Sequence, residues 1–145
     1  MSVTVKNITL WRSEVENKPG TLANALGPLA NAGADLQVVM GYRYPGNESK
    51  AAIDLYPVSG RKSIAAAQEA GLTASPIPTL LVEGENRAGL GYTIAKAIGE
   101  AGINLGFMVT QVIGRKYSAV FGFETDADAR KASSLIKKAA ASKKK

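Results

Sequence analysis

Two copies of one short motif decide the fold of this chain: ENKPGT at residues 16–21 and ENRAGL at residues 85–90. Each is a polar turn that contains glycine, follows a β-like run and precedes a helical pattern. Shifting the chain by 69 residues continues the match without a gap as far as Leu36, which falls on Leu105. A repeat of this length, with turn residues at matching offsets, indicates two copies of one supersecondary unit.

Hydrophobic periodicity gives both copies the same order of elements. Apolar residues that alternate with polar ones predict strands, apolar residues three and four apart predict helices, and glycine or proline marks the ends. In the first copy we expect extended segments at residues 1–13, 35–44, 51–56 and 72–75, with helices at 22–32 and 61–70. In the second copy we expect strands at 79–83, 104–113 and 117–124, a helix between 90 and 101, and a last helix that Thr125 caps.

Each copy therefore reads β-α-β-β-α, and a final strand follows only in the first. A β-α-β-β-α-β unit is the ferredoxin-like arrangement, an antiparallel sheet with both helices on one face. The sequence predicts an α+β protein with one such unit at residues 1–75 and another, ending in a basic tail, at 76–145. The N-terminus has surplus β residues, so we expect Ser2–Lys6 to pair with the second unit and protect its exposed edge.

The composition narrows the classes of chemistry. Histidine and cysteine are both absent, which excludes the commonest general base and the usual zinc ligands. No paired acid–base constellation is visible, and Asp54 and Glu85 are isolated acids. We therefore expect no enzyme activity, no metal and no cofactor.

The charge and hydropathy patterns bear on partners. The formal net charge is +6, but five of the 18 basic residues are lysines between positions 137 and 145, and the rest of the chain is nearly neutral. Such a terminal cluster is typical of a solvated tail, so a nucleic-acid partner is not expected. Three tyrosines that the strand pattern places on the sheet, Tyr42, Tyr44 and Tyr56, give nucleic-acid binding only weak support. No run approaches the ~20 apolar residues of a membrane span and no signal segment begins the chain, so we expect a cytoplasmic protein.

The repeated turn has a chemistry of its own. A glycine-bearing turn that opens a helix directs backbone N–H groups and the positive end of the helix dipole at one place, which suits a small anion. Asp35 and Asn104 lie fifteen residues past the two glycines, at the start of the next strand. We expect them near the turns, as partners for an ammonium group, so that the pair of features fits a free amino acid. The alternative is that each glycine only turns the chain and that Asp35 and Asn104 only cap their own backbone.

The stretches ENKPGTL at residues 16–22 and AGADL at residues 32–36, with their second copies, resemble the ACT domain. That family is a βαββαβ module that binds amino acids and related small molecules, usually to regulate a metabolic enzyme or a transcription factor. The second copy departs from the motif at Ala88, where the family has proline, and at Leu90-Gly91. The resemblance covers nearly the whole chain as two tandem units.

The resemblance implies two units packed side by side into a continuous eight-stranded antiparallel sheet, with the ligand at the joint. It implies that the first loop and the start of the second strand hold the ligand, with backbone N–H groups around Gly20 and Gly89 on its carboxylate. Carried over residue by residue, it nominates Asn17, Lys18, Pro19, Gly20, Thr21 and Asp35 in one site, and Asn86, Arg87, Ala88, Gly89, Leu90 and Asn104 in the other.

Two readings of function follow. The first is an amino-acid-binding regulator or sensor that acts on a partner in trans, and a homodimer is compatible with it. The second is a structural protein-interaction module whose ligand sites have decayed, and Ala88 is its best support. The sequence does not name the ligand, the partner or the number of sites in use.

Overall fold

The computed structural model describes residues 3–141, and Ser2 of the predicted N-terminal strand lies outside them. Contacts divide the chain into two compact units. The first unit is Thr9–Pro76, and the second combines residues 3–8 with residues 77–141. Residues 3–8 precede the first unit in the chain, but they belong to the second unit by their contacts.

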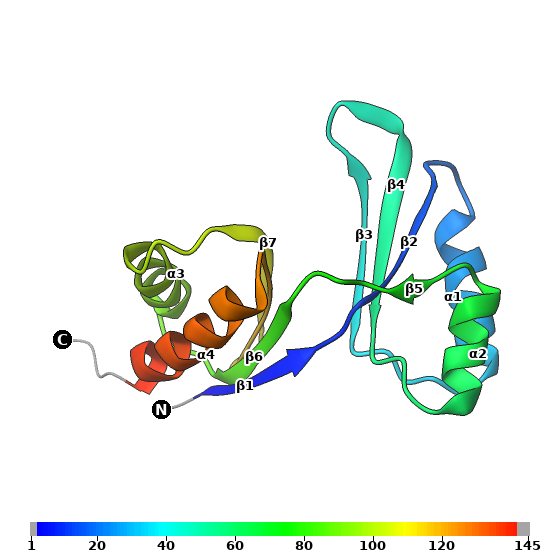
Figure 1. The fold of residues 1–145 in the computed structure, drawn as a ribbon. Coiled ribbons are helices and arrows are strands. Elements are labelled where there is room, and N and C mark those ends of the chain that lie inside the picture. The colour runs from blue at the N-terminus through cyan, green and yellow to red at the C-terminus, as the bar shows by residue number, and fades with distance from the viewer. Residues whose placement is uncertain (1–2, 142–145) are drawn as a thin grey trace. The chain divides into compact units, whose positions relative to one another are not determined.

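The first unit has the order β2 (Trp11–Glu16), α1 (Thr21–Asn31), β3 (Val38–Tyr44), β4 (Asn47–Tyr56), α2 (Arg61–Glu69) and β5 (Thr73–Ala74). Its strands form one antiparallel sheet in the order β3-β4-β2-β5. In Figure 1 the two helices lie together on one side of these strands. This is the ferredoxin-like arrangement that the sequence predicts.

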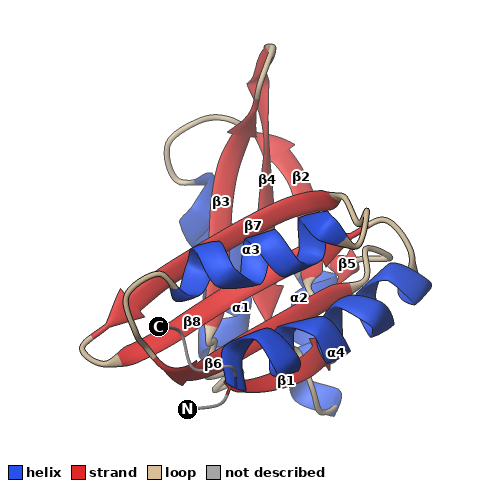
Figure 2. Ribbon diagram, turned by 90° about the vertical axis from the view of Figure 1, so that its left-hand side faces the viewer, coloured by secondary structure: helices blue, strands red, loops and turns tan. Residues whose placement is uncertain are grey.

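The second unit repeats the arrangement with β6 (Thr79–Glu85), α3 (Leu90–Glu100), β7 (Leu105–Ile113), β8 (Lys116–Phe123) and α4 (Asp126–Ala141). Its fourth strand is β1 (Val3–Ile8), and the sheet order is β1-β6-β8-β7. Figure 2 shows α3 and α4 lying across one face of this sheet. Strand β1 runs antiparallel to β6, from the pair Val3 and Gly84 to the pair Ile8 and Thr79.

The different lengths of the last helices explain why the second unit takes its fourth strand, β1, from the N-terminus. Helix α2 has nine residues, and the chain then returns to the sheet as β5. Helix α4 has 16 residues, so the corresponding chain is helical and leaves the edge of β6 open. Thr125 accepts a hydrogen bond from the Asp128 N–H at 3.0 Å, as its predicted capping role requires. Strand β1 covers the open edge, which would otherwise expose unpaired backbone groups.

Each unit has its own hydrophobic core between sheet and helices. In the first unit Leu29 and Leu55 are fully buried, and Trp11 packs against the same cluster. In the second unit Ile94 and Phe121 are fully buried at the centre of a larger cluster. The strands of the described residues form two four-stranded sheets, and the continuous eight-stranded sheet stays a prediction.

Candidate functional site

The two repeated turns have the same backbone conformation. Gly20 precedes α1 with φ 89° and Gly89 precedes α3 with φ 83°, both in the left-handed region that favours glycine. Neither helix start has a side-chain cap. The N–H groups of Asn17 and Asn86 donate to backbone carbonyl groups of the neighbouring hairpins, at 2.9 Å to Ser49 O on β4 and at 2.8 Å to Arg115 O in the turn before β8. Both loops are therefore fixed at the same end of their sheets.

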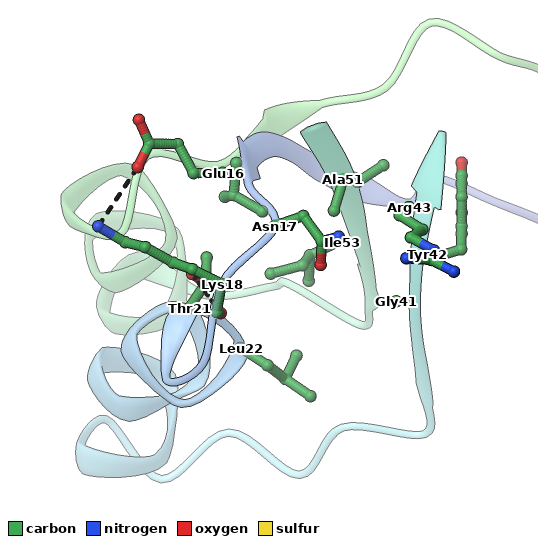
Figure 3. A pocket seen from close by; sticks show the side chains of 12 residues that line it. Glu16, Asn17, Lys18, Thr21, Leu22, Gly41, Tyr42, Arg43, Ala51 and Ile53 are labelled. Atoms are coloured by element: carbon green, nitrogen blue, oxygen red, sulfur yellow. Dashed lines mark hydrogen bonds and ion pairs between the residues drawn. The ribbon is translucent and has the colours of Figure 1, made fainter. Parts of the chain in front are cut away.

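A pocket of about 290 Å³ lies beside this loop in the first unit. Figure 3 shows it between the loop, the first turn of α1 and strands β3 and β4. Its lining is mostly apolar toward the sheet and polar toward the loop: Val15, Glu16, Asn17, Lys18, Thr21, Leu22, Gly41, Tyr42, Arg43, Ala51, Ala52 and Ile53. The volume is near the lower limit of about 300 Å³ for small-molecule sites, which suits a ligand of amino-acid size.

Within the described range, the hydrogen bonds of the loop leave two backbone N–H groups and one side-chain oxygen free to bind a ligand. Lys18 O accepts bonds from the Thr21 N–H at 3.4 Å and hydroxyl at 3.0 Å. Among the described residues the Leu22 and Ala23 N–H groups at the start of α1 have no bonded acceptor. Asn17 donates through Nδ2 to Glu48 O at 2.7 Å, and its side-chain oxygen remains as an acceptor. The loop thus offers donors for a carboxylate and an acceptor for an ammonium group.

The charged side chains of the pocket have different surroundings. Lys18 Nζ lies 3.3 Å from Glu16 Oε1, and both side chains are 66% exposed. Figure 3 shows this ion pair directed away from β3, whereas the Leu22 side chain points toward β3. Arg43, on β3, makes no hydrogen bond or ion pair in the described part of the chain. Arg43 is therefore the cation at this pocket that is free to meet an anionic ligand.

The structure brings together only some of the predicted first-site residues. Asn17, Lys18 and Thr21 line the pocket, and Pro19 and Gly20 lie in the same loop. Asp35 does not lie near them within this unit, so the expectation that the turn and the start of the next strand lie close together is wrong here. Helix α1 carries the chain from the end of β2 back to the start of β3, which places Asp35 at the opposite end of the sheet.

The predicted second-site residues are largely engaged within their own unit. Leu90 is 1% exposed and belongs to the core. The guanidinium of Arg87 donates to Ala140 O at 2.8 Å and to Ala139 O at 3.4 Å, at the end of α4. Asn104 donates to Glu124 Oε2 at 3.1 Å, at the sheet end opposite Gly89. Asn86, Ala88 and Gly89 form the exposed turn.

We predict that Arg87→Ala lowers the free energy of unfolding by about 1.5–3 kcal/mol, the usual value for hydrogen bonds to a charged group. The substitution removes two donors and a positive charge from the carbonyl end of α4, where a cation is favourable. Urea unfolding followed by circular dichroism measures the change. Arg115→Ala, at an exposed hairpin turn, is the control and should change the value by less than about 0.5 kcal/mol. Equal effects of the two substitutions would contradict the capping role.

Sequence reasoning missed the sheet side of the pocket. Arg43, Ala51 and Ile53 reach it because β3 and β4 pair next to β2, a relationship set by strand register. The alternation of residues along 51–56 indicates which of them share a face, but not which loop they face. Within residues 3–141 no three acidic side chains gather into a cluster that could hold a metal ion. None of the helices in that range combines the length and hydropathy of a membrane span.

The first sheet also carries a polar network, and Tyr42 of the pocket lining belongs to it. Tyr44 donates to Glu14 Oε2 at 2.6 Å, and this hydrogen bond is the main reason that the pKa of Tyr44 rises to about 12. Burial is the main cause of the raised pKa of the neighbouring Tyr42 phenol. Arg12 donates to both oxygens of Asp54, at 2.9 and 3.2 Å, and to Tyr42 Oη at 2.7 Å.

We predict that Tyr44 ionises about two pH units above an ordinary tyrosine. Its pKa is raised from 10.0 to about 12, so its contribution to stability is complete below pH 10.0 and is lost as the pH rises toward 12. Ultraviolet titration of the wild type against Tyr44→Phe isolates this group. Glu14→Gln should bring the pKa back toward 10.0, because it removes the carboxylate that the phenol meets. An unchanged titration of Glu14→Gln would contradict the assignment.

Comparison with known proteins identifies the fold. No protein-family model matches the sequence, and no curated protein matches it. Among solved structures, protein BT0572 from Bacteroides thetaiotaomicron matches with a TM-score of 0.71 and 14% identity, over 92% of this chain and 98% of that one. The ligand-free regulatory subunit of aspartate kinase from Thermus thermophilus matches with a TM-score of 0.65 and 14% identity, over 96% and 97% of the two chains.

The chain has the tandem ACT-type fold. E. coli aspartokinase III in complex with aspartate and ADP also matches, with a TM-score of 0.54 and 13% identity, over 94% of this chain and 32% of that one. The similarity is one of fold, and it confirms the ferredoxin-like units that the repeat predicts. Several of the matching structures are regulatory subunits or domains.

Proposed function

We propose that this tandem ACT-type chain is a regulatory or sensor protein that binds a free amino acid in the loop pocket of the first unit. The observation that carries the proposal is the pocket of about 290 Å³ beside an uncapped helix start. The Leu22 and Ala23 N–H groups and Arg43 would receive the ligand's carboxylate. The Asn17 side-chain oxygen would accept from its ammonium group, and the apolar wall of Val15, Leu22 and Ile53 would take its side chain.

The proposed role of binding is regulation. The structural neighbours include regulatory subunits of aspartate kinase, and the two units together contain all of the described residues. The binding signal would therefore act on a catalytic protein outside these two units, and we assign no catalytic role to the chain. The joint between ACT units as the ligand's position, and contacts from Asp35 and Asn104, stay predictions.

A thermal-shift screen with each of the twenty L-amino acids at millimolar concentration tests the proposal. A ligand that binds only the folded state at a hundredfold excess over its dissociation constant adds about 2.7 kcal/mol of stability, which is readily measured. We expect one amino acid or a chemically related group to respond. A flat panel would contradict amino-acid binding and favour the interaction module, for which the engaged residues of the second loop are the specific support.

The responding amino acid then tests the pocket. Arg43→Ala should weaken its binding about tenfold or more, because a charge-assisted hydrogen bond to the carboxylate is lost. Arg61→Ala, which removes an exposed arginine at the start of α2 in the same unit, is the matched control. Equal affinities of the two variants would move the site away from this pocket. In the same assay, Asn104→Ala tests the predicted contact between the Asn104 side chain of the second unit and the ligand.

A further inference from the structure

Ala51 and Tyr117 hold the same position in the two units. Ala51 lies on the central strand β4 between Val15 on β2 and Arg43 on β3. Tyr117 lies on the central strand β8 between Gly84 on β6 and Val112 on β7. The flanking residues of the second unit are those of the first shifted by the 69-residue repeat. The two positions are thus equivalent in the sheets.

The equivalent positions have different surroundings. Ala51 is partly exposed and lines the pocket of the first unit. Tyr117 is 3% exposed and belongs to the core cluster of the second unit, with Leu90. A small residue thus stands where the first unit is hollow, and a large aromatic residue stands at the same place in the second.

Neighbouring substitutions make room for the ring. Gly84 on β6 pairs with Tyr117 on β8, whereas Val15 is the residue at the equivalent position of the first unit, paired with Ala51. Gly91 occupies the position in α3 that Leu22 occupies in α1. The second unit therefore loses side-chain volume at two flanking positions and gains it at Tyr117. The Tyr117 hydroxyl is buried without a hydrogen-bond partner among the described residues, so the ring's volume rather than a hydrogen bond explains its position.

We infer that Tyr117 closes the loop site of the second unit from within, so that each chain binds one amino acid, in the first unit. The number of ligands rests on the proposed function, whereas the closure of the second site is argued only from the strand pairing in the two sheets and the burial of Tyr117. Arg87 and Leu90 of the second loop then serve the stability of their unit, which agrees with their contacts to α4 and the core. Ala51 is the residue that keeps the first site open.

The first test introduces residues of the second unit into the first unit and needs no ligand. The double variant Val15→Gly/Ala51→Tyr places the second unit's residues at two of the three equivalent positions in the first unit and keeps Leu22 on α1. Because the ring enters an existing hollow, we expect a melting temperature within a few degrees of the wild type. Ala67→Tyr, which forces the same ring into the closed core of the first unit, should lower it far more. A double variant as unstable as Ala67→Tyr would overturn the equivalence of the two sites.

The second test counts sites by two-dimensional amide NMR of the full chain, with an equimolar mixture of the twenty L-amino acids at millimolar concentration. We expect the amide signals of Gly20 and Leu22 to move and those of Gly89 and Gly91 to stay. The double variant should lose the response, and Tyr117→Phe, which keeps the ring, should retain it. Movement of the Gly89 and Gly91 signals at saturation would overturn the closure. If no signal moves in either unit, the proposed function fails, and the melting temperatures still decide the closure.

Discussion

Replacing Arg12 with alanine is expected to lower the free energy of unfolding by about 3–5 kcal/mol, because it leaves a buried carboxylate without its cation. The Asp54 side chain is fully buried, and that of Arg12 is 25% exposed. Two of the three hydrogen bonds of the Arg12 side chain are made to Asp54. The bond to Asp54 is the main cause of the raised pKa of Arg12, so the guanidinium is charged at every pH at which the protein would be studied. After the substitution, the Tyr42 hydroxyl at 3.5 Å is the remaining side-chain donor to this carboxylate.

Urea unfolding measures this loss, with Arg61→Ala as the control for removal of an exposed arginine. A second comparison separates the interaction from the cost of the unpaired charge. The double variant Arg12→Met/Asp54→Leu removes both charges, and we expect it to be much closer to the wild type than Arg12→Ala alone. A loss below about 1 kcal/mol for Arg12→Ala would show that water reaches Asp54.

Replacing Leu29 with alanine is expected to destabilise the first unit by about 2–5 kcal/mol and to leave the second unit folded. Leu29 is fully buried in the core of the first unit, and the cavity left by its side chain is lined by residues of that unit. Ile94 is equally buried in the core of the second unit, so Ile94→Ala is the matched substitution. Two cores that share no residue favour separate unfolding transitions.

The two units can be followed separately in one sample. Trp11, the single tryptophan, lies in the first unit, so its fluorescence reports the unfolding of that unit. Circular dichroism reports the helices of both. We expect Leu29→Ala to shift the fluorescence midpoint and Ile94→Ala to shift only the dichroism. If both substitutions shifted both signals equally, the chain would unfold as one cooperative unit.

Much of the fold followed from local patterns in the sequence. The repeat of the ENxxG turn fixed the number of units, because a left-handed glycine before a helical pattern has the same local meaning in any tertiary context. Hydrophobic alternation located the strands, since the core side of a sheet alternates along the chain. The surplus β residues at the N-terminus indicated a strand with no partner nearby in sequence, and Lys6 pairs with Leu81 of β6.

The site was less accessible to the same reasoning. The spacing from Gly20 to Asp35 suggested proximity, but the helix between them spans the sheet and separates them. Arg87 was assigned to ligand binding by its place in the motif. Its actual acceptors are Ala139 and Ala140, more than fifty residues away in sequence. Contacts of this kind depend on where a distant helix ends.

By itself, the sequence determined the two-unit ferredoxin-like architecture and the glycine turns, because periodicity and backbone conformation are local properties. Only the tertiary structure showed the pocket beside the first loop. The pairing register shifts between Arg43 and Tyr44 in the first hairpin. The residue of the second unit that is equivalent to Ala51 is therefore Tyr117, 66 residues later rather than 69. The repeat read without a gap therefore never sets these two residues against each other. Strand pairing does, since register is fixed by burial of the whole sheet face.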